Sequence, residues 1–174
     1  MQAAAHHDKP SPLTFDRSSD GWPVPDFTLV DQHGDALTRH RLLGQWTFVL
    51  FGDTHCEGPC TNGLSTLSAL RARIARAQVV HSTQLLFVSL DPVRDDALRL
   101  KAYLAPYDSE LVAATGSAQA VAVMADEFGV NPRSGYNGAL VLVGPEGHVR
   151  AMYLPPYDVR LLTADYLLKR ARRR

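Results

Sequence analysis

Two cysteines, Cys56 and Cys60, are the residues best suited to chemistry, because only three residues separate them. A pair this close is typical of a redox-active dithiol or a metal clamp, and two cysteines are too few for the disulfide framework of a small secreted domain. A structural zinc site needs about four ligands, and the chain has no other thiols. Two inert cysteines are the structural alternative, since a free thiol can pack as a small hydrophobic group.

The segment around the pair predicts how the two thiols are positioned. It follows the apolar run 46–51, which is typical of a strand buried on both faces. Pro59 is tolerated only in the first turn of a helix, so a helix is expected to begin near Gly58 or Pro59, with Cys56 in the loop before it. Cys60 then lies in the first turn, where free amides and the helix dipole stabilise a thiolate. This arrangement allows the two cysteines either to form a disulfide or to coordinate a soft metal through both sulfurs.

Ionisable side chains flank the cysteines. We expect His55 to be an exposed loop residue, with stabilisation of a thiolate or metal ligation as the alternative. Asp53 and Glu57 would raise the pKa of a thiol that lies close to their charges. Asp91 ends a second buried strand at the same sheet edge, and we expect it to cap the next helix together with Pro92 rather than to shape the site.

The rest of the chain alternates predicted strands and helices. Strands are expected at 26–30, 46–51, 85–90, 111–114, 140–143 and 148–153, the last two forming a hairpin. Helices are expected after the cysteines, from Asp95 or Asp96 toward Tyr103, from Ser117 to Phe128, and from Asp158 to about Lys169. This order predicts an α/β sandwich around a mixed sheet, with residues 1–20 as a flexible tail and 21–174 as one domain.

Composition indicates a globular domain and excludes several classes of protein. The chain is 45% apolar and 21% charged, which argues against disorder, and its net charge of zero excludes a nucleic-acid binder that relies on a basic excess. No apolar run approaches the roughly 18 residues of a membrane helix, and the first residues lack the pattern of a signal peptide.

Residues 169–174 hold five cations. We expect a solvated helix end there, with attraction to an anionic surface as the alternative.

Several segments, taken in order, resemble the Sco/SenC family, thioredoxin-like proteins associated with assembly of the copper site of cytochrome c oxidase. The resemblance covers about residues 25–168 and rests on FTLVDQHG, LLGQWTFVLFGDTHCEGPC, LLFVSLDPVRDDALRLKAYLAPY with the following ATG, and YNGALVLVGPEGHVR. The CxxxC loop combined with the DPxRD segment is much more specific than CxxxC alone. The resemblance implies a thioredoxin-like fold and an extracytoplasmic location, on the periplasmic side of the inner membrane. It also implies membrane attachment upstream of the soluble domain, although this chain shows no signal or anchor.

The resemblance further implies copper bound by the two cysteines and one histidine. The expected histidine position holds Asn137, which is a poor ligand for soft Cu(I). Glu57 and Thr61 also stand where the family usually has prolines. Copper would then depend on Cys56 and Cys60, with His55 as a weak substitute for the third ligand, and Cu(II) binding is expected to be weak.

These features lead to three functional hypotheses. The favoured one is a Sco-type thiol–disulfide oxidoreductase, in which Cys56 attacks and Cys60 resolves, because exchange needs no third ligand. Its expected partner is a cysteine-containing copper-site subunit of a respiratory oxidase or another copper chaperone. The alternatives are a metallochaperone that holds copper through the same cysteines and a noncatalytic thioredoxin-like interaction module.

Overall fold

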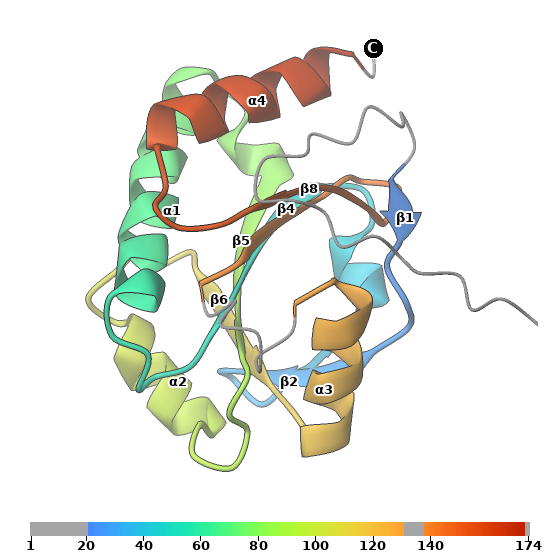
Figure 1. The fold of residues 1–174 in the computed structure, drawn as a ribbon, viewed down its shortest axis with the longest axis vertical. Coiled ribbons are helices and arrows are strands. Elements are labelled where there is room, and N and C mark those ends of the chain that lie inside the picture. The colour runs from blue at the N-terminus through green and yellow to red at the C-terminus, as the bar shows by residue number, and fades with distance from the viewer. Residues whose placement is uncertain (1–20, 131–137, 173–174) are drawn as a thin grey trace, which may run out of the picture.

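One mixed β-sheet organises the computed structural model, which describes residues 21–130 and 138–172 (Figure 1). The eight strands found in these residues follow the order β1-β8-β7-β4-β5-β6-β2-β3. Their bounds are β1 (Trp22–Pro23), β2 (Thr28–Asp31), β3 (Ala36–Thr38), β4 (Trp46–Gly52), β5 (Thr83–Ser89), β6 (Val112–Thr115), β7 (Leu140–Val143) and β8 (His148–Tyr153). The α-helices are α1 (Pro59–Arg76), α2 (Ala97–Leu104), α3 (Ala118–Glu127) and α4 (Val159–Ala171).

The centre of the sheet is a parallel pair whose carboxyl ends lie at one edge. β4 pairs in parallel with β5, from Trp46 opposite Thr83 to Gly52 opposite Ser89. β7 runs antiparallel to β4 on the other side. All seven residues of β4 are buried, as expected for a strand covered on both faces. The loops leading to α1 and α2 both leave from the carboxyl edge, so residues in these loops can meet.

Alternate side chains of β4 contribute to two separate cores. Phe48 and Leu50 belong to a core shared with α1, α2 and α4. Val49 and Phe51 face the other side, where they pack with β2 and α3. Figure 1 shows α3 on one side of the sheet and α1 with α4 on the other. The predicted sandwich around a mixed sheet is therefore confirmed.

Element boundaries agree with the sequence wherever a local signal was present. The hairpin of β7 and β8 spans the predicted residues, and Gly147 has the positive φ of its turn. Ser117 and Asp158 cap α3 and α4 as predicted. The strands β1 and β3 were not predicted, because two or three residues carry no usable periodicity. In the described part of the chain, every helix is too short or too polar to cross a bilayer. The predicted tail, 1–20, lies outside the described residues.

Candidate redox and metal site

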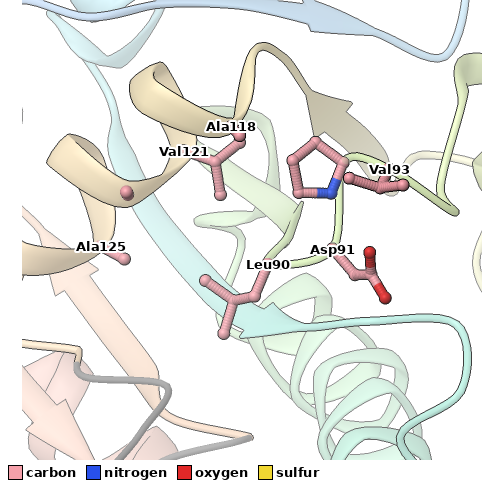
Figure 2. A pocket seen from close by; sticks show the side chains of 8 residues that line it. Leu90, Asp91, Val93, Ala118, Val121 and Ala125 are labelled. Carbon is pink, nitrogen blue, oxygen red and sulfur yellow. The ribbon is translucent and has the colours of Figure 1, made fainter.

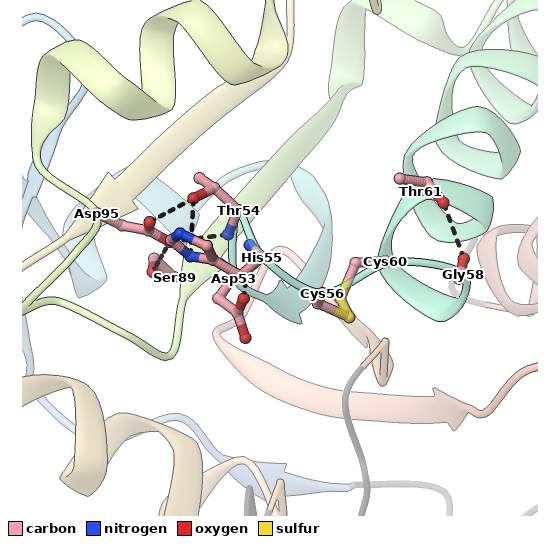
Figure 3. Close-up of a disulfide and its surroundings, with 9 residues drawn as sticks. All are labelled: Asp53, Thr54, His55, Cys56, Gly58, Cys60, Thr61, Ser89 and Asp95. Atoms are coloured by element: carbon pink, nitrogen blue, oxygen red, sulfur yellow. Dashed lines mark hydrogen bonds between the residues drawn. A yellow bond between two sulfur atoms is a disulfide. The ribbon is translucent and has the colours of Figure 1, made fainter.

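The structure joins Cys56 to Cys60 in a disulfide, with their Cα atoms 5.7 Å apart (Figure 3). α1 begins at Pro59, as predicted, and Cys60 lies in its first turn. Cys56 lies in the preceding loop, and Gly58 between them has φ +74°, a conformation that favours glycine. Cys60 is fully buried, whereas Cys56 is partly exposed. The sulfur of Cys56 is therefore the one that a second protein can reach.

Gly52, the last residue of β4, lets the first turn of α1 lie directly against the sheet. A Cβ atom at this position would be 2.5 Å from the Cys60 sulfur and 3.3 Å from the Phe87 ring. Real Cβ atoms essentially never come within 3.0 Å of another atom, so a larger residue at position 52 would displace the Cys60 sulfur. The sequence offered only a weak signal for this role, a glycine at the end of a strand pattern.

A buried carboxylate, that of Asp95, holds the cysteine-bearing loop in place. Asp95 is fully buried and accepts hydrogen bonds from the backbone N–H of Thr54, 2.9 Å, and from the Thr54 hydroxyl, 2.6 Å. It also accepts a hydrogen bond from the Ser89 hydroxyl at the end of β5, 2.7 Å. Figure 3 shows these bonds linking the two loops beside the disulfide. The loop after β5 thus fixes the backbone two residues before Cys56.

Arg99 extends this network across the surface to His55. Its Nε lies 3.6 Å from Asp95 Oδ1 and donates to the Thr54 hydroxyl, 2.9 Å. A terminal nitrogen of Arg99 lies 3.0 Å from His55 Nε2. A guanidinium only donates, so the lone pair of His55 Nε2 is used by this contact. His55 is exposed, as expected. In this arrangement His55 Nε2 accepts from Arg99 and is not free to bind a metal beside the sulfurs.

Asp91 does not cap α2, and this prediction was wrong. The cap is Asp96, whose carboxylate accepts from the backbone N–H of Arg99, 2.7 Å. Asp91 instead closes the turn before the helix, because its side chain binds Arg94 and its carbonyl accepts from the N–H of Asp95, 3.0 Å. The Arg94 side chain lowers the pKa of Asp91 below its usual value. This turn places Asp95 beneath the cysteine loop.

A partly buried tyrosine, Tyr103, lies close to the same acidic groups. The hydroxyl of Tyr103 has no hydrogen-bond partner among the described residues. Burial raises its pKa to about 12, and the charges of Tyr107, Asp53 and Asp95 act in the same direction. The Tyr103 ring packs 5.8 Å from that of Phe87, the residue against Gly52. Tyr103 is thus held neutral beside the ring that packs against Gly52.

The entry to β7 lies against the start of α1. A Cβ atom at Gly138 would be 3.0 Å from Pro59 Cβ and 3.1 Å from the hydroxyl oxygen of Tyr157. Gly138 also has φ +84°, so both its conformation and its surroundings favour glycine. Asn137, at the position expected for a histidine, lies outside the described residues.

An apolar hollow of about 260 Å³ lies beside the loop after β5 (Figure 2). It is lined by Leu90, Asp91, Pro92, Val93 and four residues of α3. Asp91 is the only ionisable group in this lining, and it is bound by Arg94. The hollow therefore lacks the converging polar groups that a small-molecule reaction requires.

The metal donors at the site are the two sulfurs. Among residues 21–130 and 138–172, no three His, Cys, Asp or Glu side chains are grouped so that they could hold a metal ion. In the disulfide, neither sulfur is a thiolate. After reduction, Cys56 and Cys60 would offer the soft donors that suit Cu(I).

Comparison with known proteins shows which family the chain belongs to. The SCO1/SenC family model matches residues 19–165. This chain belongs to the SCO1/SenC family. The mitochondrial SCO2 homologue of Danio rerio is 31% identical over 133 residues, which are 70% of this chain and 48% of that protein. A putative copper-binding protein of Stutzerimonas stutzeri is 28% identical over 143 residues, which are 76% of this chain and 70% of that protein. The chain thus spans about half the length of the mitochondrial relative.

Solved Sco structures share the fold. Arabidopsis thaliana ScoI, determined with copper bound, superposes with a TM-score of 0.75 at 24% identity, covering 85% of this chain and 98% of that one. Yeast Sco1 with copper bound gives the same TM-score and identity, covering 90% of this chain and 94% of that one. The predicted thioredoxin-like fold and family are therefore confirmed.

Proposed function

We propose that this Sco-family protein is a thiol–disulfide oxidoreductase whose reacting residues are Cys56 and Cys60. Its partner is an oxidised cysteine pair on a copper-site subunit of a respiratory oxidase or on a copper chaperone. The supporting observation is the asymmetry of the disulfide: Cys56 is partly exposed in a loop, and Cys60 is fully buried in the first turn of a helix. One sulfur can meet a partner, and the other is protected until exchange begins.

The reaction starts from the reduced protein. The Cys56 thiolate attacks one sulfur of the partner disulfide, forming a mixed disulfide and releasing the partner's second sulfur as a thiolate. The Cys60 thiolate then attacks the Cys56 sulfur and displaces the partner's remaining thiolate. Two electrons pass to the partner, which becomes a dithiol, and this protein ends as the Cys56–Cys60 disulfide. Free amides in the first turn of α1 stabilise the Cys60 thiolate between the two steps.

An extracytoplasmic location, on the periplasmic side of the inner membrane, belongs to the same proposal. Disulfides persist in oxidising compartments and are reduced in the cytosol. A protein whose cysteines cycle between dithiol and disulfide while it acts on a copper site outside the cytoplasm would work in the periplasm.

The two single-cysteine variants test the roles of the cysteines. Cys60→Ser should form a stable mixed disulfide with a small disulfide-containing peptide, because its accessible Cys56 has no resolving partner. Cys56→Ser should react at least about tenfold more slowly, because the peptide cannot readily reach the buried thiol of Cys60. Each variant is the control for the other, and mass spectrometry measures the adduct.

The pH dependence of the same reactions gives a second readout. One cysteine should titrate below the usual value of about 8.5, because the helix N-terminus favours a thiolate. Equal rates for the two variants, with both cysteines titrating near 8.5, would reject the exchange mechanism and favour a noncatalytic interaction module.

Copper transfer is the second candidate function. It is favoured by the Stutzerimonas relative named for copper binding and by the Sco structures with copper bound. Reduced Cys56 and Cys60 would bind Cu(I) as a pair, and Asn137 would leave Cu(II) weakly held. Copper titration of the reduced protein tests this function, and Asn137→His should strengthen Cu(II) binding. Tight Cu(II) binding by the unmodified protein would instead require another residue as third ligand.

A further inference from the structure

The helix α4 carries an apolar stripe on its outward face. Leu161 is 70% exposed and Leu168 is 57% exposed, and Ala164 between them is also exposed. Residues at i, i+3 and i+7 share one face of a helix, so these three side chains form a continuous stripe. The opposite face carries Leu162 and Tyr166, which are buried in the core. The stripe therefore points away from the protein and takes no part in the core.

Positive charge flanks and follows this stripe. Arg160 and Arg172 are exposed, one at each end of α4, and Arg160 lies 3.8 Å from the carboxylate of the cap Asp158. In the sequence, residues 169–174 hold five of the 18 Lys and Arg residues, which leaves 13 cations against 18 Asp and Glu in the rest of the chain. Asp165, the acidic residue of the helix, pairs with Lys169 at 3.0 Å. The end of α4 is thus basic on a molecule whose remaining charge is negative.

We propose that α4 binds an anionic membrane surface, with the stripe of Leu161, Ala164 and Leu168 entering the headgroup region. An exposed apolar face bordered by Arg and Lys is the pattern of helices that lie in the membrane interface, where the cations reach anionic headgroups. An anionic bilayer attracts this end of the molecule and repels the remainder, so charge alone orients the protein. This surface is separate from the redox site and does not depend on the proposed exchange reaction.

The position of α4 in the fold is compatible with a working disulfide. Tyr166, in the middle of α4, packs edge-on against Trp46 and Phe48 in the first half of β4. The disulfide lies past the other end of that strand. A protein bound through the outward face of α4 therefore keeps Cys56 accessible to a partner.

Vesicle co-sedimentation of the whole chain tests this proposal. We expect binding to vesicles of phosphatidylcholine and phosphatidylglycerol in a two-to-one ratio, little binding to pure phosphatidylcholine, and loss of binding at high salt. Replacing both Leu161 and Leu168 by Ser should weaken binding by about tenfold or more, because the apolar contribution is lost. Replacing Arg172, Arg173 and Arg174 by Gln should weaken it by a similar factor.

A matched control comes from two other exposed apolar residues. Val93 is 88% exposed and Leu98 is 77% exposed, but neither lies on α4. The Val93→Ser, Leu98→Ser double variant should bind anionic vesicles as the unmodified protein does. Equal weakening by this control would overturn the proposal, as would failure of the unmodified protein to bind.

Two further measurements can contradict the inference. A concentration-dependent dimer that disappears in the Leu161→Ser, Leu168→Ser variant would show that the stripe is covered by a second copy. Disulfide reduction by dithiothreitol should proceed at the same rate with and without anionic vesicles. A rate reduced by about tenfold on vesicles would place the disulfide, rather than the face of α4, against the membrane.

Discussion

Asp95 and Asp96 are neighbours in the sequence, but they have different roles in the structure. Asp96 is exposed and caps α2, whereas Asp95 is buried and binds Thr54 and Ser89. The sequence predicted that either could begin the helix, and it could not separate them, because Thr54 is 41 residues away along the chain. The cysteines themselves were identified from spacing alone. The residues that position them, Asp95 and Gly52, became visible only when α1 was placed on the sheet.

Substituting the two aspartates separately tests the role of Asp95. Asp95→Ala should lower the free energy of unfolding by about 2–4 kcal/mol, because buried donors lose their acceptor and Arg99 loses its charge partner. Asp96→Ala should cost about 1 kcal/mol, the usual loss for a helix cap. Urea denaturation measures both effects.

The rate of disulfide reduction in the folded protein separates positioning from stability. Asp95→Ala should change this rate, because the loop before Cys56 is released, and Asp96→Ala should leave it unchanged. Identical behaviour of the two variants in both measurements would show that Asp95 does not position the loop.

Helix starts are the elements that local sequence predicted best. Pro59, Ser117 and Asp158 each mark a helix start through a property of a single residue: a missing N–H, or a side chain that accepts from the first turn. Edge strands have no such marker. β1 and β3 exist because they pair with β8 and β2, which are placed by the fold as a whole.

The cap of α4 should make stability depend on pH. The backbone N–H groups of Arg160 and Leu161 lower the pKa of Asp158 in the folded protein. The contribution of Asp158 to stability is therefore complete above its pKa in the unfolded chain, about 3.9. It is lost as the pH falls through the lower pKa that Asp158 has in the folded protein. Asp158→Asn keeps an equally good cap but removes the charge.

Thermal unfolding of the two proteins measures this effect. The unmodified protein should have the higher Tm near neutral pH, and the difference should shrink as the pH falls below the unfolded-state pKa of about 3.9. Ser117→Asn, which exchanges one neutral cap for another on α3, should show no such pH-dependent difference. A difference between Asp158→Asn and the unmodified protein that stays constant as the pH is lowered well below about 3.9 would contradict this assignment.

The central sheet brings two loops that are distant in the sequence to one edge. β4 and β5 are parallel, so the cysteine loop and the Asp95 loop both leave from their carboxyl ends. Alternating strands and helices predicted the α/β class, and the resemblance to the Sco/SenC family supplied the thioredoxin-like fold. Periodicity could not supply the order of the strands, because that order depends on which long-range pairs form.

A titration of the native protein in glutathione redox buffers would show whether the Cys56–Cys60 disulfide works as a redox couple. Free thiols would be counted after acid quenching, and near-UV circular dichroism would monitor the fold throughout. We predict that both cysteines are reduced and reoxidised together, in one reversible two-electron transition, while the fold is retained. Thiols that appear only when the protein unfolds, or a reduced protein that stays folded but cannot be reoxidised, would contradict the proposed function.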